Sequence, residues 1–218
     1  MGRRFELIVF DWDGTLMDST GAIVASIKAA ATDLGITPPS DERASHIIGL
    51  GLIDALRHAL PDLPAERYQD VALRYRQHYM ARDQDLLLFA GAAALIDELA
   101  AAGHMLAVAT GKTRKGLDRA FEVSGLGPRF HASRCADECH SKPHPQMLDE
   151  LMAEFGVGPE VTLMIGDTTH DLQMARNARV AALGVAYGAH PRHALEAEAP
   201  LYCAGTVAEL AAWLRQQA

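Results

Sequence analysis

The chain has 218 residues, of which 49% are hydrophobic and 22% are charged, and its formal net charge is −8. This composition is typical of a globular protein, and the length is sufficient for one sizeable core with an inserted subdomain. The negative charge argues against a nucleic-acid partner, because such a partner requires a basic surface. We therefore expect the partners to be small molecules.

Two features of the sequence bear on its location. We find no run of the roughly 18 apolar residues that a membrane span needs, and residues 1–6 lead into an apolar segment without a secretory signal. The three cysteines are too few, and odd in number, for a disulfide framework. We expect a cytoplasmic protein that does not bind membranes, and the sequence leaves both a monomer and a homodimer open.

Residues 7–10 (Leu-Ile-Val-Phe) form an apolar run that predicts a short buried strand. The following loop carries two carboxylates, Asp11 and Asp13, and Gly14 allows it to turn sharply. Two acids this close repel each other unless a metal ion, hydrogen bonds or a shared proton compensates their charge. The loop is therefore either a functional site or a capped turn.

The next part of the chain is helical by its pattern. Ser19 or Thr20 can cap a first helix, for which Gly35 is the stop signal. Residues 41–82 continue in helical periodicity with a Gly-Leu-Gly-Leu break at 49–52, and they contain no strand candidate. We predict an all-helical insert here.

Beyond residue 91, helical segments alternate with short apolar strands. The predicted strands lie at 105–109, near Phe130, and at 161–165, 180–185 and 201–203, and the predicted helices lie at 92–102, 113–124, 145–155, 169–178 and 207–214. This alternation predicts an α/β fold, a doubly wound and mostly parallel sheet with helices on both faces. The predicted domains are a core of residues 1–16 and 88–218 and a helical cap subdomain of residues 17–87.

Polar residues also follow the later strands, where ligands bind in such sheets. Thr110, Gly111 and Lys112 precede a helix N-terminus, which suits a phosphate, although an ordinary N-cap is the alternative. Lys142 is followed by Pro143, which favours an extended backbone and would hold the lysine at the mouth of the sheet. A lysine at such a position is otherwise a surface residue.

A further acidic pair follows the strand predicted at 161–165. Asp167 would lie at the start of a helix and Asp171 about one turn further on, so both can face one pocket. Capping explains one of these acids better than it explains both. The four groups of residues each follow a strand, which indicates one shared site.

Together these motifs resemble the haloacid dehalogenase superfamily. They are D-x-D-G-T-L at 11–16, T-G-K at 110–112, K-P-x-P at 142–145 and G-D-x-x-x-D at 166–171. The helical insert resembles the small cap of the phosphoglycolate phosphatase-like branch of that superfamily. One departure is Gly111, where family members often carry Asn, so the phosphate contact would fall to Thr110 and to the backbone.

The resemblance implies a Mg²⁺-dependent phosphatase that hydrolyses a small phosphomonoester, with phosphoglycolate as the first candidate. It gives Asp11 as the nucleophile that forms an aspartyl-phosphate and Asp13 as the acid and base for the leaving group and the water. The implied Mg²⁺ ligands are the Asp11 carboxylate, the Asp13 backbone carbonyl and Asp167, with Asp171 close by.

The remaining positions of the motifs would bind the phosphoryl group. Lys142 and Thr110, with the backbone at Gly111, would hold its oxygens and balance the charge that develops on them. The helical insert would act as a lid that excludes water and contacts the leaving group.

Four other functions remain open at this stage. A phosphomutase shares the scaffold, and a haloacid dehalogenase proper would need neither an acid at Asp13 nor a metal. A signalling module would accept phosphate on an aspartate without turnover, but such modules are shorter and lack a cap. A scaffold subunit without activity is the fourth, although the intact Asp11, Asp13, Lys142 and Asp167 argue against it.

Several other residues have two interpretations. The thiols and imidazoles of His131, Cys135, Cys139 and His140 could suggest zinc, but the group is compact and lacks a distant second pair, which favours ordinary loop residues.

Candidate substrate contacts also lie on the insert, and two histidines lie near the end of the chain. The possible contacts are Lys28, Arg43, His46 and Arg57, most of which we expect to be solvated. His190 and His193 are expected to be surface histidines on a loop.

Overall fold

A computed structural model describes residues 4–82 and 86–218. Residues 1–3 of the predicted core and residues 83–85 of the predicted cap lie outside the described residues. In the described part of the chain, no helix is both long enough and apolar enough to cross a membrane.

Within the described residues, six parallel strands form one sheet in the order β3-β2-β1-β4-β5-β6. Their bounds are β1 Leu7–Phe10, β2 Met105–Thr110, β3 Ala132–Cys135, β4 Thr162–Gly166, β5 Ala181–Val185 and β6 Tyr202–Ala204. The strand order reverses at β1, which pairs with β2 on one side and with β4 on the other. The predicted α/β fold is therefore confirmed, and its switch point lies directly before Asp11 and Asp13.

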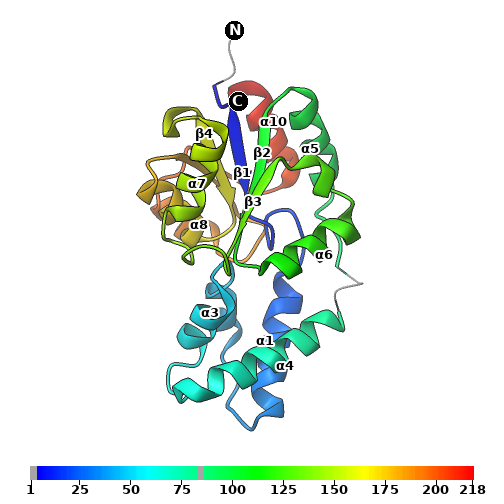
Figure 1. Ribbon diagram of the computed structural model, residues 1–218, viewed down its shortest axis with the longest axis vertical. Helices are drawn as coiled ribbons and strands as arrows, with labels where there is room; N and C mark the ends of the chain where they lie inside the picture. The colour runs from blue at the N-terminus through cyan, green and yellow to red at the C-terminus, as the bar shows by residue number, and fades with distance from the viewer. Residues whose placement is uncertain (1–3, 83–85) are drawn as a thin grey trace.

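Helices cover both faces of the sheet (Figure 1). One face packs against α5 Ala92–Ala101, α6 Arg114–Ser124 and α10 Val207–Gln217, and the other against α7 Gln146–Phe155 and α8 Thr169–Asn177. Successive residues of β1 alternate between the two cores, since Ile8 and Phe10 belong to the first and Leu7 and Val9 to the second. Burial on both faces explains why β1 is an uninterrupted apolar run.

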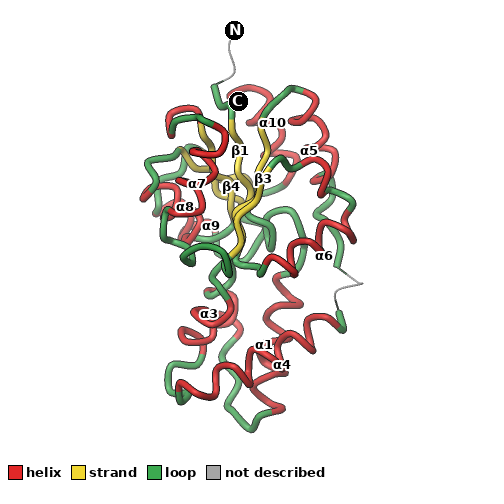
Figure 2. The backbone as a smooth tube through the Cα atoms, viewed as in Figure 1, coloured by secondary structure: helices red, strands yellow, loops and turns green. Residues whose placement is uncertain are grey.

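The helical insert follows β1 and lies beyond the carboxyl ends of the strands, apart from the sheet (Figures 1 and 2). It contains α1 Thr20–Asp33, α2 Asp41–His46, α3 Leu52–Ala59, the 3₁₀ turn η1 Ala65–Arg67 and α4 Tyr68–Met80. These helices have an apolar cluster of their own, which includes Ile27, Leu56 and Val71. The insert can therefore pack as a unit over the site end of the sheet.

The two chain segments that join the insert to the core run side by side. Met17 forms an antiparallel bridge with Leu88, the Asp18 amide donates to the Leu87 carbonyl at 2.9 Å and the Phe89 amide donates to the Leu16 carbonyl at 2.9 Å. This paired connection fixes where α1 leaves the core.

Three local predictions differ from the structure. The strand predicted near Phe130 is β3 at Ala132–Cys135, an edge strand whose first three residues are only half-buried and therefore lack an apolar pattern. The segment after Pro191, predicted as a loop, contains the short helix α9 Arg192–Ala197. Ser19 occupies the N-cap of α1 but makes no capping hydrogen bond, because its hydroxyl is used in the site described below.

Two further 3₁₀ turns are η3 Gly127–Arg129 and η4 Pro159–Val161.

A pair of leucine substitutions tests the assigned core. Leu151 of α7 is fully buried against the sheet, whereas Leu73 of α4 is 56% exposed. We expect Leu151→Ala to lower the free energy of unfolding by about 2–5 kcal/mol because it leaves a cavity, and Leu73→Ala to change it by less than about 0.5 kcal/mol. Urea unfolding followed by circular dichroism measures both, and equal effects of the two substitutions would contradict the packing.

Candidate active site

The predicted site residues meet at the carboxyl end of the sheet. Asp11 and Asp13 follow β1, Thr110 ends β2 and Asp167 follows β4. The loop after β1 is anchored by Trp12, whose buried ring packs edge-on against Phe121 at 5.3 Å and Phe130 at 6.2 Å. This apolar anchor directs the flanking carboxylates away from the core.

Lys142 lies at the centre of the acidic residues. Its Nζ donates to Oδ1 of Asp11 and to Oδ1 of Asp171, each at 2.6 Å. All three side chains are almost completely buried. Burial alone would lower the pKa of Lys142, but the charges of Asp11 and Asp171 outweigh it and raise that pKa, so the lysine stays charged.

Asp167 is held by two hydrogen bonds and two close glycines. The Thr15 hydroxyl donates to its Oδ1 at 2.9 Å and the Ala189 amide donates to its Oδ2 at 2.7 Å. A Cβ at Gly14 or at Gly188 would overlap the Asp167 side chain. Backbone from two loops thus closes around this carboxylate, which explains the glycine in the D-x-D-G-T-L motif.

Asp171 has both carboxylate oxygens engaged. Oδ1 accepts from Lys142, and Oδ2 accepts from the Thr168 hydroxyl at 2.7 Å and the Thr168 amide at 3.1 Å. Thr168 and Asp171 form a reciprocal capping box at the start of α8. The capping interpretation therefore holds for Asp171, and the same carboxylate also orients Lys142.

Asp13 faces a different set of partners. Its Oδ1 accepts from the Ser19 hydroxyl at 2.6 Å, lies 3.0 Å from Lys112 Nζ and lies 3.5 Å from the Tyr79 hydroxyl. Tyr79 belongs to α4 of the insert, and Ser19 directly precedes α1. Asp13, to which the family resemblance gives the role of acid for the leaving group, thus lies where the insert meets the core.

The donor set fits a divalent cation. Oxygens of Asp11, Asp167 and Asp171 lie within 4.8 Å of one another, and Oδ2 of Asp11 is buried without a hydrogen-bond partner among the described residues. Four buried carboxylates, with Asp13 the fourth, face the two lysines Lys142 and Lys112. Carboxylate oxygens are ligands that Mg²⁺ prefers, and a double positive charge would balance the excess of acid.

Burial raises the pKa values of two of these acids, Asp11 and Asp167. Burial is the largest cause that raises the pKa of Asp11 to about 7, with Lys142 opposing the shift and Asp171 adding to it. Burial, followed by the charge of Asp11, also raises the pKa of Asp167 well above its usual range. A cation between these groups would favour their ionised forms.

The T-G-K segment contributes through its backbone and its close packing. Thr110 is buried, and its hydroxyl accepts the Lys112 amide at 3.2 Å. A Cβ added to Gly111 would lie 2.5 Å from the Leu50 carbonyl oxygen and 2.6 Å from that of Gly49. The Gly-Leu-Gly-Leu break of the insert therefore rests directly on Gly111, and the larger side chain often found there in the family does not fit this arrangement.

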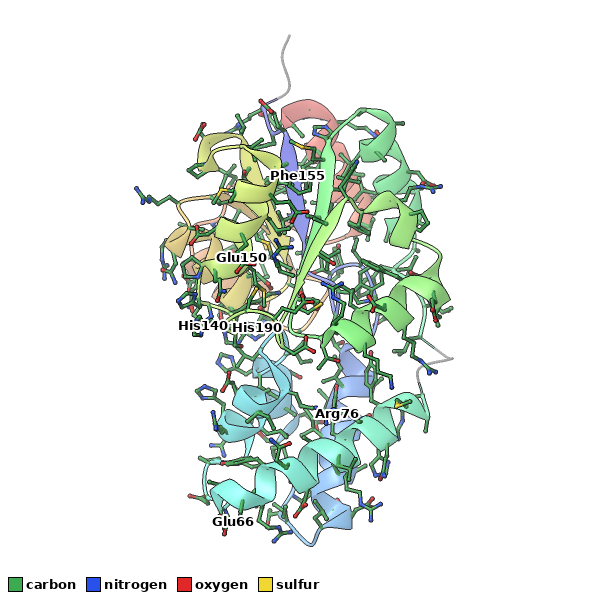
Figure 3. All side chains as sticks on the ribbon, in the orientation of Figure 1. Glu66, Arg76, His140, Glu150, Phe155 and His190 are labelled. Atoms are coloured by element: carbon green, nitrogen blue, oxygen red, sulfur yellow. The ribbon has the colours of Figure 1, made fainter. Side chains whose placement is uncertain are left out.

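The prediction that His190 is a surface residue is wrong. His190 is only 3% exposed, its Nδ1 accepts the Thr169 amide at 3.0 Å, and its Nε2 can then donate to the His46 carbonyl at 3.1 Å. The His190 ring stacks on that of His46 at 4.9 Å, and burial lowers the pKa of His190 to about 4. Figure 3 shows His190 where the insert meets the core, so a neutral imidazole joins α2 to the start of α8. His193 is exposed, as expected.

Of the candidate contacts on the insert, His46 reaches the core. Lys28 pairs with Asp41 and Arg57 pairs with Asp54 on the surface of the insert, and Arg43 is exposed. His46, Leu50, Lys142 and His170 line part of a cavity of about 530 Å³ between the insert and the core. Of the proposed catalytic and phosphate-binding residues, Lys142 is the one that lines this cavity.

Among the described residues, the donors that lie close enough together to share an ion are the acidic group, and His131, Cys135, Cys139 and His140 are not part of it. Cys135 is buried in β3, and Cys139 Sγ lies 3.7 Å from Glu150. Burial raises the pKa of the Cys135 thiol to about 12, so it remains protonated.

The sequence does not predict that Ser19, Tyr79 and Lys112 contact Asp13. The sequence predicts Ser19 or Thr20 as a helix cap, and Tyr79 lies within the segment 41–82 that is predicted to be helical. Lys112 was visible as the third residue of T-G-K, which is a signal for its position but not for its partner. Their contact with Asp13 depends on how the insert sits on the core.

Comparison with known proteins agrees with this arrangement. The family model of the haloacid dehalogenase-like hydrolases matches residues 8–185. A probable phosphatase, IndB, of Dickeya dadantii is 37% identical over 94% of this chain and 91% of its own length. A phosphoglycolate phosphatase of Agrobacterium fabrum is 29% identical over 84% of this chain and 81% of its own length.

A solved structure shows the same fold. The crystal structure of a predicted phosphoglycolate phosphatase from Haemophilus somnus superimposes with a TM-score of 0.86 over 96% of this chain and 98% of that chain, at 24% sequence identity. The chain belongs to the haloacid dehalogenase-like hydrolase family. The relatives and solved structures that it resembles include proteins named as a probable phosphatase and as phosphoglycolate phosphatases.

The contact at Gly111 yields a prediction about closure of the insert. We expect Gly111→Ala to displace the 49–50 backbone and to lower kcat/KM by about 10–100-fold, since a displacement of about 1 Å can cost this much. Gly21→Ala is the control, because a Cβ at Gly21 in α1 meets nothing within 4 Å. Steady-state kinetics with equal rates for Gly111→Ala and wild type would contradict the close contact.

The raised pKa of Asp11 yields a prediction about stability. The raised pKa means that the folded protein favours the protonated form of the Asp11 carboxyl. The contribution of Asp11 to the free energy of unfolding is therefore full below the pKa of the unfolded chain, near 4, and is lost as the pH rises through the folded-state pKa of about 7. In chelator, we therefore expect Asp11→Asn to be more stable than wild type at pH 8 by about 1–3 kcal/mol, with the difference shrinking toward pH 5. Denaturant unfolding at both values measures it, and a difference that grows toward pH 5 would contradict the assignment.

Proposed function

We propose that this protein is a Mg²⁺-dependent phosphomonoesterase that acts on a small phosphorylated metabolite through an aspartyl-phosphate on Asp11. The observation that carries the proposal is the position of Asp11, with Oδ1 fixed by Lys142 and Oδ2 buried without a described partner. One oxygen is thus oriented while the other remains available to phosphorus or to a cation.

Asp11 would attack phosphorus and form an acyl-phosphate bond as the bond between phosphorus and the leaving oxygen breaks. Lys142 would hold a phosphoryl oxygen and balance its charge, with Asp171 keeping the lysine in place. The Thr110 hydroxyl and the backbone at Gly111 would complete the binding of the phosphoryl group, near a helix N-terminus.

Asp13 would give its proton to the leaving oxygen and then accept a proton from water. The resulting hydroxide would attack phosphorus, break the bond to Asp11 and release phosphate, which restores the Asp11 carboxylate and leaves Asp13 protonated for the next turnover. The contact of Asp13 with Ser19 and Tyr79 supports this role, because it positions the acid where the insert covers the site. Such acid and base assistance contributes about 10²–10⁴-fold.

Mg²⁺ would be held by the Asp11 carboxylate and Asp167, with the Asp13 backbone carbonyl as the third proposed ligand. When bound, it would neutralise charge on the phosphoryl oxygens. Asp171, whose two oxygens already have partners, fits the supporting role better than direct coordination. Phosphoglycolate is the first substrate to test, since relatives of this branch carry that name.

The proposal is tested with purified protein, Mg²⁺, p-nitrophenyl phosphate and 2-phosphoglycolate. We expect release of phosphate by the wild type, loss of activity in chelator, and a fall of at least about 10⁴-fold in Asp11→Asn because the nucleophile is removed. Asp62→Asn, the same change at an exposed turn, is the control. Wild-type inactivity toward a wide panel of phosphate esters, or full activity of Asp11→Asn, would refute the proposal.

The division of roles between the two loop acids is tested with Asp13→Asn. We expect kcat to fall by about 10²–10⁴-fold because proton transfer is lost. Mg²⁺ affinity, measured by calorimetry, should remain near the wild-type value, because the proposed ligand at this residue is the backbone carbonyl. A near-normal kcat would rule out Asp13 as the acid and base.

A further inference from the structure

A second lysine at the site has different partners from Lys142. Lys112 follows the end of β2, and its Nζ lies 3.0 Å from Oδ1 of Asp13 and donates to the Tyr79 hydroxyl at 3.0 Å. The ammonium also lies 4.7 Å from the centre of the Tyr79 ring. One cation therefore joins the core to α4 of the insert at the proposed acid.

The two lysines would serve different parts of a substrate. Lys142 lies between Asp11 and Asp171, where the phosphoryl group would bind, and its side chain has no exposed surface. The Lys112 side chain retains 12% exposure and pairs with Asp13, which faces the leaving oxygen under the proposed function. Positive charge is thus present on the leaving-group side, where phosphoryl binding does not require it.

Asp13 has a partner that does not depend on Lys112. The Ser19 hydroxyl donates to the same carboxylate oxygen at 2.6 Å. The ammonium can therefore turn toward another anion while Asp13 stays in position. Tyr79 provides a second donor beside it, and its position on the insert means that the donor is in place when the insert covers the site.

We propose that Lys112, assisted by Tyr79, is a specificity residue that binds an anionic group on the leaving alcohol, such as a carboxylate one or two carbons from the ester oxygen. This inference rests on the proposed function. Lys112 would favour phosphomonoesters of short hydroxy acids over those of neutral alcohols. A neutral leaving group offers no anion to Lys112, so the ammonium would stay paired with Asp13.

The experiment compares two esters of equal chain length, 2-phosphoglycolate and 2-hydroxyethyl phosphate, in the wild type, Lys112→Met, Lys112→Arg and Lys115→Met. The wild type should prefer 2-phosphoglycolate, and the ratio of the two kcat/KM values should fall by about 10–100-fold in Lys112→Met, as expected for loss of a charge-assisted hydrogen bond. Lys112→Arg should restore part of the ratio. Lys115→Met changes an exposed lysine three residues away and should preserve it.

An equal loss for both esters in Lys112→Met would overturn the inference, since it would show that Lys112 only supports Asp13 and the insert. A wild type with no preference for the anionic ester would also overturn it. Both results would leave the proposed phosphatase function standing, whereas a wild type inactive toward every ester would refute that function itself. Circular dichroism checks folding, and Lys112→Gln provides a second neutral variant for the same ratio.

Discussion

The ion pairs of Lys142 with Asp11 and Asp171 determine how this site can exist. Isolated burial of a carboxylate is costly, and here three acids that could share a cation lie within 4.8 Å of one another. A single ammonium, 2.6 Å from two of them, offsets only part of this repulsion. Hydrogen bonds from Thr15, Thr168 and Ala189 offset a further part of the repulsion between the carboxylates. The site remains net negative, which suits a divalent cation.

This constraint also explains the division between core and insert. The core positions Asp11, Asp167 and Asp171 through strand ends, a capping box and close glycines. Asp13 instead has partners next to or within the insert, so its surroundings change if the insert moves. The sheet therefore positions the side chains that would bind the phosphoryl group. The helices of the insert contribute the partners of Asp13, which would face the leaving alcohol.

Sequence patterns predicted the sheet because its central strands are buried on both faces and therefore read as apolar runs. They misplaced β3, where Ala132, Ser133 and Arg134 sit at a half-buried edge, and missed α9, which is only six residues long. The acids were found because each follows a strand. The environment of His190 and the contacts of Lys112 could not be predicted, since both depend on the placement of the insert, which local periodicity does not encode. The domain boundaries at residues 16/17 and 87/88 remain predictions.

The most direct test of the account is the identity of the phosphorylated residue during turnover. Wild-type protein with Mg²⁺ would be mixed with a ³²P-labelled phosphate ester, quenched in acid within milliseconds, digested and mapped by mass spectrometry. The account predicts transient, acid-stable label on the peptide that contains Asp11, at a level that rises and decays with the rate of phosphate release. Label on another residue, or steady phosphate release with no labelled peptide at any quench time, would contradict it.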